Sequence, residues 1–328
     1  MLFAVAILLN MFCQNSNGEF IPNLLISKTR VMILKIKKEL PYLAMLLPSF
    51  LVYSILLVLP IILTLLLSLS DWNGGPITNI KFDFAGIQNY TGILQDNGLL
   101  TVLKNTILYA LLQPLGVTVL AIPLAMLLCT SMKTRNFQRA VFFFPSVPSP
   151  LILGYLWAYI LSSQTSGVVN QAITSLGGNP VPWLSNSVMA MVSVLIVGIW
   201  SQTGWHACIY IAQIQSIPEE YYEAAKIDGA GWFCEFRHIT LPMLRPAFMT
   251  SSLLLLLNAL KVFELPYALT SGGPGYSTTM FTQIIIQRGF IDKMYGRATA
   301  ASILFGIFVA AVGYCQQHFA NKEKKEIV

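Results

Sequence analysis

Charged side chains are scarce in this sequence of 328 residues: Asp, Glu, Lys and Arg make up 10%, whereas hydrophobic residues make up 55%. Soluble domains typically contain about 25% charged residues. A chain with less than half that proportion lacks the polar groups to cover a water-exposed surface, which excludes a long soluble enzyme and a disordered protein. The composition therefore predicts an integral membrane protein.

Several signatures of catalytic and metal-binding proteins are also missing. The sequence contains no GxxxxGK[ST] phosphate-binding loop, no HExxH pair and no nucleophile elbow. Its five cysteines show no CxxC spacing, and its three histidines are isolated from one another. We therefore expect a chain that is not an enzyme, holds no metal or cofactor, and does not hydrolyse ATP itself.

Six apolar stretches are long enough to cross a bilayer, which requires roughly 20 apolar residues in a helix. Polar segments with Gly, Pro and Asn separate them and are expected to be loops. The sequence therefore predicts an all-α integral membrane protein with six transmembrane helices. The expected spans are Tyr42–Ser68, Thr101–Cys129, Val141–Leu161, Met189–Gln213, Phe248–Leu269 and Ala298–Cys315.

The net charge of +6 reports the orientation of these spans rather than binding to nucleic acid. Of the 20 Lys and Arg residues, 14 lie in the segments on the side of the two termini and four in the loops on the opposite side. Because basic residues accumulate on the cytoplasmic side, we expect both termini in the cytoplasm.

Residues 1–31 fit this organisation poorly. Met1–Cys13 is apolar but too short to span a membrane, and it lacks the positive start of a signal peptide. A basic flank leading into the first span begins at Met32. We expect Met32, or a residue near it, to be the functional start, so that residues 32–328 form the six-helix membrane domain and residues 1–31 are an extension. The alternative is a short amphipathic segment on the membrane surface.

The cytoplasmic loop after the fourth span, residues 214–246, carries signals of ordered structure. Ser216, followed three residues later by Glu219, predicts a capping box at the start of a helix. Gly229 is expected to end that helix, and a second short helix should begin near Trp232 and be broken by prolines before the fifth span. The pattern predicts a helix–turn–helix that docks a partner rather than a solvated connector.

This loop resembles the EAA loop of permease subunits of binding-protein-dependent ABC importers. The motif of that family is Glu-Ala-Ala, three residues, Gly, nine residues and Ile-x-Leu-Pro. The sequence matches every spacing, with Glu223, Ala224, Ala225, Gly229, Ile239, Leu241 and Pro242.

The sugar and glycerol-phosphate branch of this family is similar to the chain along nearly all of residues 40–318. The resemblance includes Gly86–Tyr90, Tyr222–Ala230, Thr270–Pro274 and Tyr295–Ala300. It implies a type I ABC importer permease fold in a bacterial or archaeal cytoplasmic membrane, and import of a sugar, oligosaccharide, polyol or glycerol phosphate by ATP-driven alternating access. The N-terminal extension departs from the family pattern.

The resemblance also implies partners: a second permease subunit, a cytoplasmic ATPase dimer that binds ATP and Mg²⁺, and an extracytoplasmic solute-binding protein. In the family, the loop inserts into a groove of the ATPase and couples the two. The residues implied in this coupling are Glu223, Ala224, Ala225, Asp228, Gly229, Ile239, Leu241 and Pro242.

Polar and charged side chains inside spans are costly in lipid, and they usually face a cavity or a partner. A hydroxylated solute needs amide and charged groups beside an aromatic ring, which the outer half of the fifth span offers. Candidate pathway residues are Asn258, Lys261, Phe263, Glu264, Trp200 and Trp157, and Asn105, Gln113, Tyr159 and Gln202 are further candidates within spans.

Alternatives remain open for these residues and for the whole chain. Lys261 and Glu264 could form a structural ion pair at i,i+3, and the tryptophans could be interfacial anchors or packing residues. An ion-coupled secondary transporter would require inverted repeats and buried acidic residues, yet Glu264 is the sole acidic residue well inside an expected span.

Overall fold

The computed structural model describes residues 42, 45–74, 84–130, 133–163 and 167–327. These residues form helices, with one isolated antiparallel bridge between Ser70 and Phe84, which confirms the all-α prediction. The chain divides into two units, Met1–Leu63 and Thr64–Val328.

A single long helix runs from Met45 to Ser68, at the end of the first unit and the start of the second. It contains a π-helical turn, η1 (Ser54–Val58), followed by α3 (Leu59–Ser68). Its Leu, Ile and Val side chains are largely exposed, as expected for a helix that faces lipid. The helix agrees with the expected first span.

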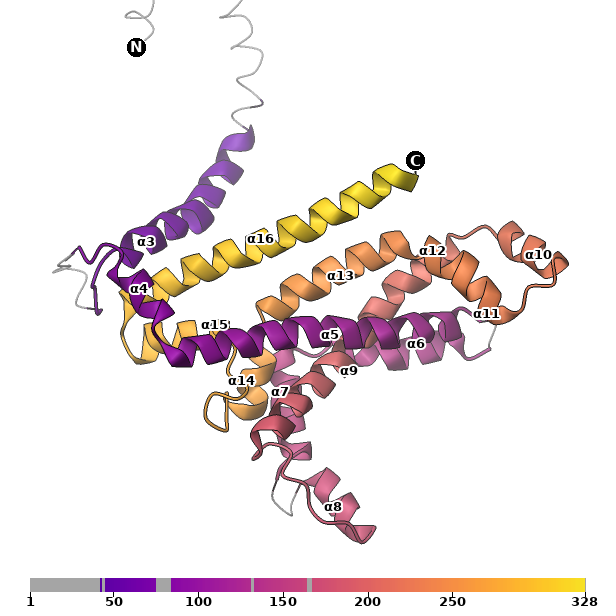
Figure 1. Ribbon diagram of the computed structural model, residues 1–328, viewed down its shortest axis with the longest axis horizontal. Coiled ribbons are helices and arrows are strands. Elements are labelled where there is room, and N and C mark those ends of the chain that lie inside the picture. The colour runs from indigo at the N-terminus through magenta and orange to yellow at the C-terminus, as the bar shows by residue number, and fades with distance from the viewer. Residues whose placement is uncertain (1–41, 43–44, 75–83, 131–132, 164–166, 328) are drawn as a thin grey trace, which may run out of the picture. The chain divides into compact units, whose positions relative to one another are not determined.

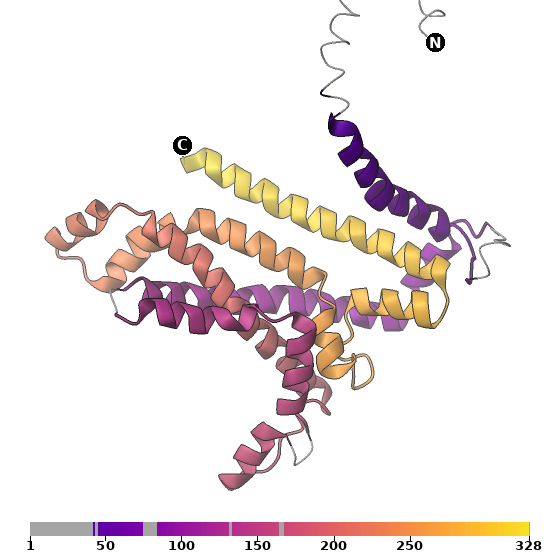
Figure 2. The same ribbon diagram turned by 180° about the vertical axis from the view of Figure 1, so that it is seen from behind.

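The second unit holds the remaining helices (Figure 1). In both views α13 lies between α5 and α16 (Figure 1, Figure 2), and α5 also packs along α9. The helices are α4 (Gln88–Leu94), α5 (Asn97–Cys129), α6 (Arg135–Phe143), η3 (Phe144–Ser146), α7 (Pro150–Ile160), α8 (Val168–Ser175), α9 (Ser187–Gln215), α10 (Glu220–Ile227), α11 (Trp232–Glu235), η4 (Phe236–Thr240), α12 (Leu241–Met243), α13 (Arg245–Leu260), α14 (Glu264–Thr270), α15 (Phe281–Ile286), η5 (Gln287–Ile291) and α16 (Tyr295–Ile327).

Four helices are long and apolar enough to cross a membrane: Met45–Ser68, Gly98–Cys129, Ser187–Gln215 and Tyr295–Ala320. Two further spans arise if each of two bent helix pairs counts as one, which gives up to six among the described residues. The count of six spans and the cytoplasmic position of the termini therefore stay predictions.

The third expected span, Val141–Leu161, is not a continuous helix, so this prediction is wrong in detail. The chain bends by 90° between the helix ending at Ser146 and α7. Pro148 and Pro150 cannot donate backbone hydrogen bonds, and Ser149 between them is extended. The Ser149 hydroxyl accepts a hydrogen bond from the backbone N–H of Ile152 and so caps α7.

The fifth expected span, Phe248–Leu269, is also interrupted, because α13 ends at Leu260 and α14 begins at Glu264. Thr282, from the neighbouring α15, donates a hydrogen bond to the carbonyl of Val262 at 2.6 Å. A distant hydroxyl thus satisfies a backbone group that the broken helix leaves without an intrahelical partner.

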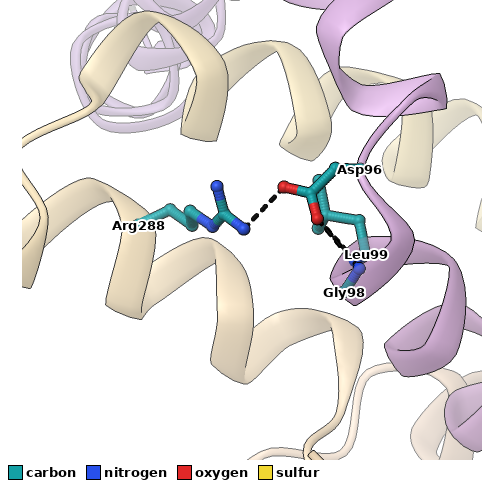
Figure 3. Close-up of polar contacts among 4 residues, drawn as sticks. All are labelled: Asp96, Gly98, Leu99 and Arg288. Carbon is teal, nitrogen blue, oxygen red and sulfur yellow. Dashed lines mark hydrogen bonds and ion pairs between the residues drawn. The ribbon is translucent and has the colours of Figure 1, made fainter.

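The start of α5 is fixed by Asp96 (Figure 3). One oxygen of its carboxylate, Oδ1, accepts hydrogen bonds from the backbone N–H groups of Gly98 and Leu99. The other, Oδ2, pairs with Arg288 of η5 at 2.6 Å, and both side chains are about four-fifths buried. The cap begins α5 four residues before the expected start of the second span, and the ion pair attaches that end to η5.

Candidate functional site

The helix–turn–helix expected between the fourth and fifth spans is present, but the capping box that was expected to start it is not. Ser216 ends α9, where its hydroxyl donates to the carbonyl of Gln213 at 2.7 Å. The first helix of the loop, α10, instead begins at Glu220, with Glu219 at the N-cap position and no side-chain cap. The capping prediction is wrong because Ser216 already serves the preceding helix.

The turn after α10 depends on Gly229, which has φ +76°. This left-handed conformation lets the N–H of Ala230 bond to the carbonyl of Ala225 at 2.9 Å and that of Gly229 to Lys226 at 3.1 Å. The chain then reverses direction within a few residues and enters α11.

The second helix of the loop runs through α11, η4 and α12, from Trp232 to Met243. The rings of Trp232 and Phe236 stack on its surface, with centroids 6.1 Å apart. The break expected before the fifth span is present as a 63° bend at Leu244, between Pro242 and Pro246, although Pro242 itself lies inside the helix. The π-helical turn η4 ends at Thr240, two residues before Pro242, and Pro242 has no N–H to donate to the helical hydrogen-bond ladder.

The two helices of the loop are joined by a hydrogen bond between the hydroxyls of Tyr222 and Thr240, 3.0 Å apart. The implied coupling residues all remain at the surface. Glu223, Ala224, Asp228, Gly229, Leu241 and Pro242 are exposed, and Ala225 and Ile239 are half-buried. The loop is therefore a connected, outward-facing element rather than a loose linker.

We expect Gly229→Ala to destabilise the loop locally, because a left-handed conformation costs a residue with a Cβ atom about 1 kcal/mol. No described atom lies within 4 Å of the added methyl, so the effect would come from the backbone alone. The measurement is hydrogen exchange of the Ala230 amide, which should accelerate about fivefold.

Gly231→Ala is the matched control, since Gly231 is equally open but has φ −81°. Its effect on exchange should be negligible. Equal acceleration in both variants would contradict a special backbone requirement at Gly229.

A cavity of about 400 Å³ lies where α13 breaks. Four of the six pathway candidates line it: Asn258, Lys261, Phe263 and Glu264. Gln113 and Ser201 also contribute polar groups from α5 and α9. The interruption at residues 261–263 lines this cavity, and non-helical backbone in membrane proteins is tolerated in such places.

Gln113 is a buried polar group of this cavity. Its side chain is 3% exposed, and its Oε1 atom has no hydrogen-bond partner among the described residues. Buried acceptors normally have a donor, so Gln113 Oε1 is, among the described residues, an unsatisfied acceptor in the wall of the cavity. The sequence predicts Gln113 to be an amide within a span. Only the structure shows that it lines the same cavity as Asn258.

The charged residues of the cavity do not form the structural ion pair that was the alternative to a pathway role. Lys261 ends α13 and Glu264 begins α14, so the i,i+3 geometry of one helix is lost. Within the described ranges, Asp96–Arg288 is the one ion pair shorter than 4 Å. Lys261 and Glu264 therefore offer one charge of each sign to the cavity.

Gln202 of α9 also lines the cavity, and the other candidates lie elsewhere. Trp157 and Trp200 are not part of the cavity lining and pack edge to face, with ring centroids 5.3 Å apart, as the packing alternative predicts. Asn105 donates hydrogen bonds to the carbonyls of Tyr276 and Thr279, and Tyr159 is exposed. Among the residues that the structure describes, no cluster of three or more potential metal ligands occurs.

Comparison with known proteins gives consistent matches. Residues 89–325 match the family described as "Binding-protein-dependent transport system inner membrane component". The chain is 34% identical over 295 residues to the probable ABC transporter permease protein YurN of Bacillus subtilis, covering 88% of this chain and 98% of that protein.

Two further matches are to proteins whose names state what they transport. The chain is 31% identical to the probable starch degradation products transport system permease protein AmyD of Thermoanaerobacterium thermosulfurigenes, covering 85% and 94% of the two chains. It also superposes on a chain of a bacterial alginate ABC transporter, crystallised with an alginate pentasaccharide-bound periplasmic protein. The TM-score is 0.73 and the identity 27%, covering 89% of this chain and 96% of that one.

Proposed function

The chain belongs to the family of binding-protein-dependent transport system inner membrane components, and we propose that it is the permease subunit of an ABC importer for a carbohydrate. It is a multi-pass membrane protein with the fold of an ABC importer permease. The relatives named for starch degradation products and for alginate support a sugar or oligosaccharide as the solute. Polyols and glycerol phosphate belong to the same proposal.

The cavity at the break of α13 is the observation that carries this function. It brings together amide, hydroxyl and charged groups, from Gln113, Asn258, Ser201, Lys261 and Glu264, beside the ring of Phe263. Its volume of about 400 Å³ is within the range of small-molecule sites, roughly 300–1,000 Å³. Neutral hydroxyl-rich solutes suit such a mixed lining, because each hydroxyl can both donate and accept.

The coupling loop, residues 214–246, would pass the energy of ATP hydrolysis from the ATPase to the membrane helices. In this proposal α10 and the helix Trp232–Met243 bind a cytoplasmic ATPase dimer through the exposed motif residues, from Glu223 to Pro242. That partner binds ATP and Mg²⁺ and this chain hydrolyses none. A second permease subunit completes the pathway, and an external binding protein delivers the solute.

Membership in a binding-protein-dependent family speaks against the alternative of an ion-coupled transporter. The proposal is tested with radiolabelled maltodextrins, alginate oligosaccharides and glycerol phosphate in vesicles that contain the assembled complex. Uptake of at least one of them should require ATP and survive collapse of ion gradients. Uptake driven by an ion gradient without ATP would overturn the proposal.

We expect Asn258→Ala to reduce that uptake by about tenfold, the effect of removing one buried hydrogen bond to a solute. Co-purification of the ATPase should be unchanged, because Asn258 lies in the cavity rather than in the coupling loop. Asn179→Ala, at an exposed position outside the cavity, is the control and should transport normally. If ATPase binding fell and the residual complexes transported normally, the pathway assignment would be wrong.

A further inference from the structure

A buried hydrogen bond joins the two helices on either side of the coupling loop. Nδ1 of His206 in α9 lies 2.8 Å from the hydroxyl oxygen of Ser251 in α13, and both residues are fully buried. The two residues are 45 positions apart in sequence, and the whole loop lies between them. The other ring nitrogen of His206, Nε2, has no partner in the described part of the chain.

The surroundings of this pair are apolar. Leu244, at the N-cap of α13, and Ala247, Ser251 and Leu255 within α13 are buried and recur at helical spacing. Ser251 is the polar member of this stripe. Ala207, Tyr210 and Ile211 of α9 pack in one hydrophobic cluster with Leu244, Ala247 and Leu255. Residues of α5 belong to this cluster too. The hydrogen bond is therefore the directional contact in an interface otherwise made by packing.

The difference between a directional hydrogen bond and apolar packing affects how two helices can move against each other in a membrane. Lipid solvates apolar side chains as well as a neighbouring helix does, so membrane helices are held together by close packing and by interhelical hydrogen bonds rather than by a hydrophobic driving force. A buried hydrogen bond fixes the register of the two helices, because breaking it leaves polar atoms unpaired in an apolar setting.

We propose that the His206–Ser251 hydrogen bond holds α9 and α13 together as one unit, so that a movement of the coupling loop passes to both helices at once. The inference rests on the proposed function, in which an ATPase moves that loop. α9 enters the loop and α13 leaves it, and α13 ends at the break that lines the cavity. His206 and Ser251 are thus positioning residues that connect the loop to the cavity.

The test measures distances between spin labels in the complete complex, with ATP and vanadate as the probe and no added solute. The five native cysteines are replaced, and labels are placed at exposed positions. A first pair, Val188→Cys on α9 and Phe248→Cys on α13, reports whether the two helices move together. A second pair, Ile227→Cys on α10 and Leu115→Cys on α5, reports whether the loop moves at all.

Vanadate trapping should change the second distance and leave the first unchanged in the otherwise native protein. In His206→Leu the first distance should change by about 2 Å or more, the scale of helix shifts at packed interfaces. Ser251→Ala removes the same hydrogen bond with minimal change of volume, and it should change the first distance by a similar amount. His206→Asn places an amide where Nδ1 lies and should restore the native result.

Gln316→Leu is the matched control, because Gln316 of α16 donates a hydrogen bond to Ser252 of α13, next to Ser251. This bond does not connect to α9, so the first distance should stay constant. An unchanged first distance in both His206→Leu and Ser251→Ala, with a moving loop, would overturn the proposed unit. A loop that does not move in the native protein would instead refute the proposed coupling function, and the inference with it.

Discussion

Replacing Glu223 with Lys should abolish ATP-driven uptake and reduce co-purification of the ATPase by tenfold or more. Glu223 is exposed in the first turn of α10, so the folded chain should lose less than about 1 kcal/mol of stability. At an interface, however, a reversed charge confronts groups arranged for the opposite sign, which typically costs several kcal/mol. The measurements are the amount of ATPase retained on the tagged permease and uptake in vesicles.

Glu220→Lys is the control, since Glu220 lies in the same exposed first turn and the change of charge is identical. Both substitutions lose the same favourable interaction with the positive end of the helix dipole. We expect Glu220→Lys to retain ATPase and transport, because Glu220 lies outside the Glu-Ala-Ala motif. Normal transport by Glu223→Lys would refute the coupling role of this residue.

Gly204→Ala should strongly destabilise the packing of α9 against α6 and η3. A Cβ atom at Gly204 of α9 would overlap the carbonyl oxygen of Phe142 and lie 2.6 Å from its carbonyl carbon. These are backbone atoms, so no rotamer change relieves the clash, and α6 and η3 would have to move away from α9. Overpacking of this severity costs about 3 kcal/mol or more.

The expected result is a several-fold loss of monodisperse protein on size exclusion in detergent, and a lower midpoint of thermal unfolding. Gly306→Ala in α16 is the control, because no described atom lies within 4 Å of the position of its Cβ. That variant should behave like the native protein. Comparable yield and stability of the two variants would contradict the close approach of the third span to α9.

Hydropathy located the membrane helices well where a span is continuous. The fourth expected span, Met189–Gln213, differs from α9 by two residues at each end, because its limits are set locally by the side chain of Asn186, which caps α9, and by Ser216. The third and fifth spans were predicted as continuous, since an apolar run does not reveal where a helix is interrupted. The interruption at Val262 depends on Thr282, which lies 20 residues away.

The coupling loop likewise has one feature that the sequence predicts and one that it does not. Its reversal was predictable, because Gly229 is a local signal for a left-handed turn. The start of α10 was not, because Ser216 could serve either the helix before it or the helix after it. In the structure, the Ser216 hydroxyl donates a hydrogen bond to the carbonyl of Gln213 at the end of α9.

The sequence by itself determined that this protein is helical and membrane-embedded, and that it carries the EAA motif of its family, since these properties depend on composition and short-range spacing. Tertiary structure decided which polar residues meet: Gln113 joins Asn258 in the cavity, while Trp157 and Trp200 pack on each other outside it. It also paired His206 with Ser251. In an apolar membrane a buried polar side chain must find a partner or a cavity, and its choice depends on how helices distant in sequence pack together.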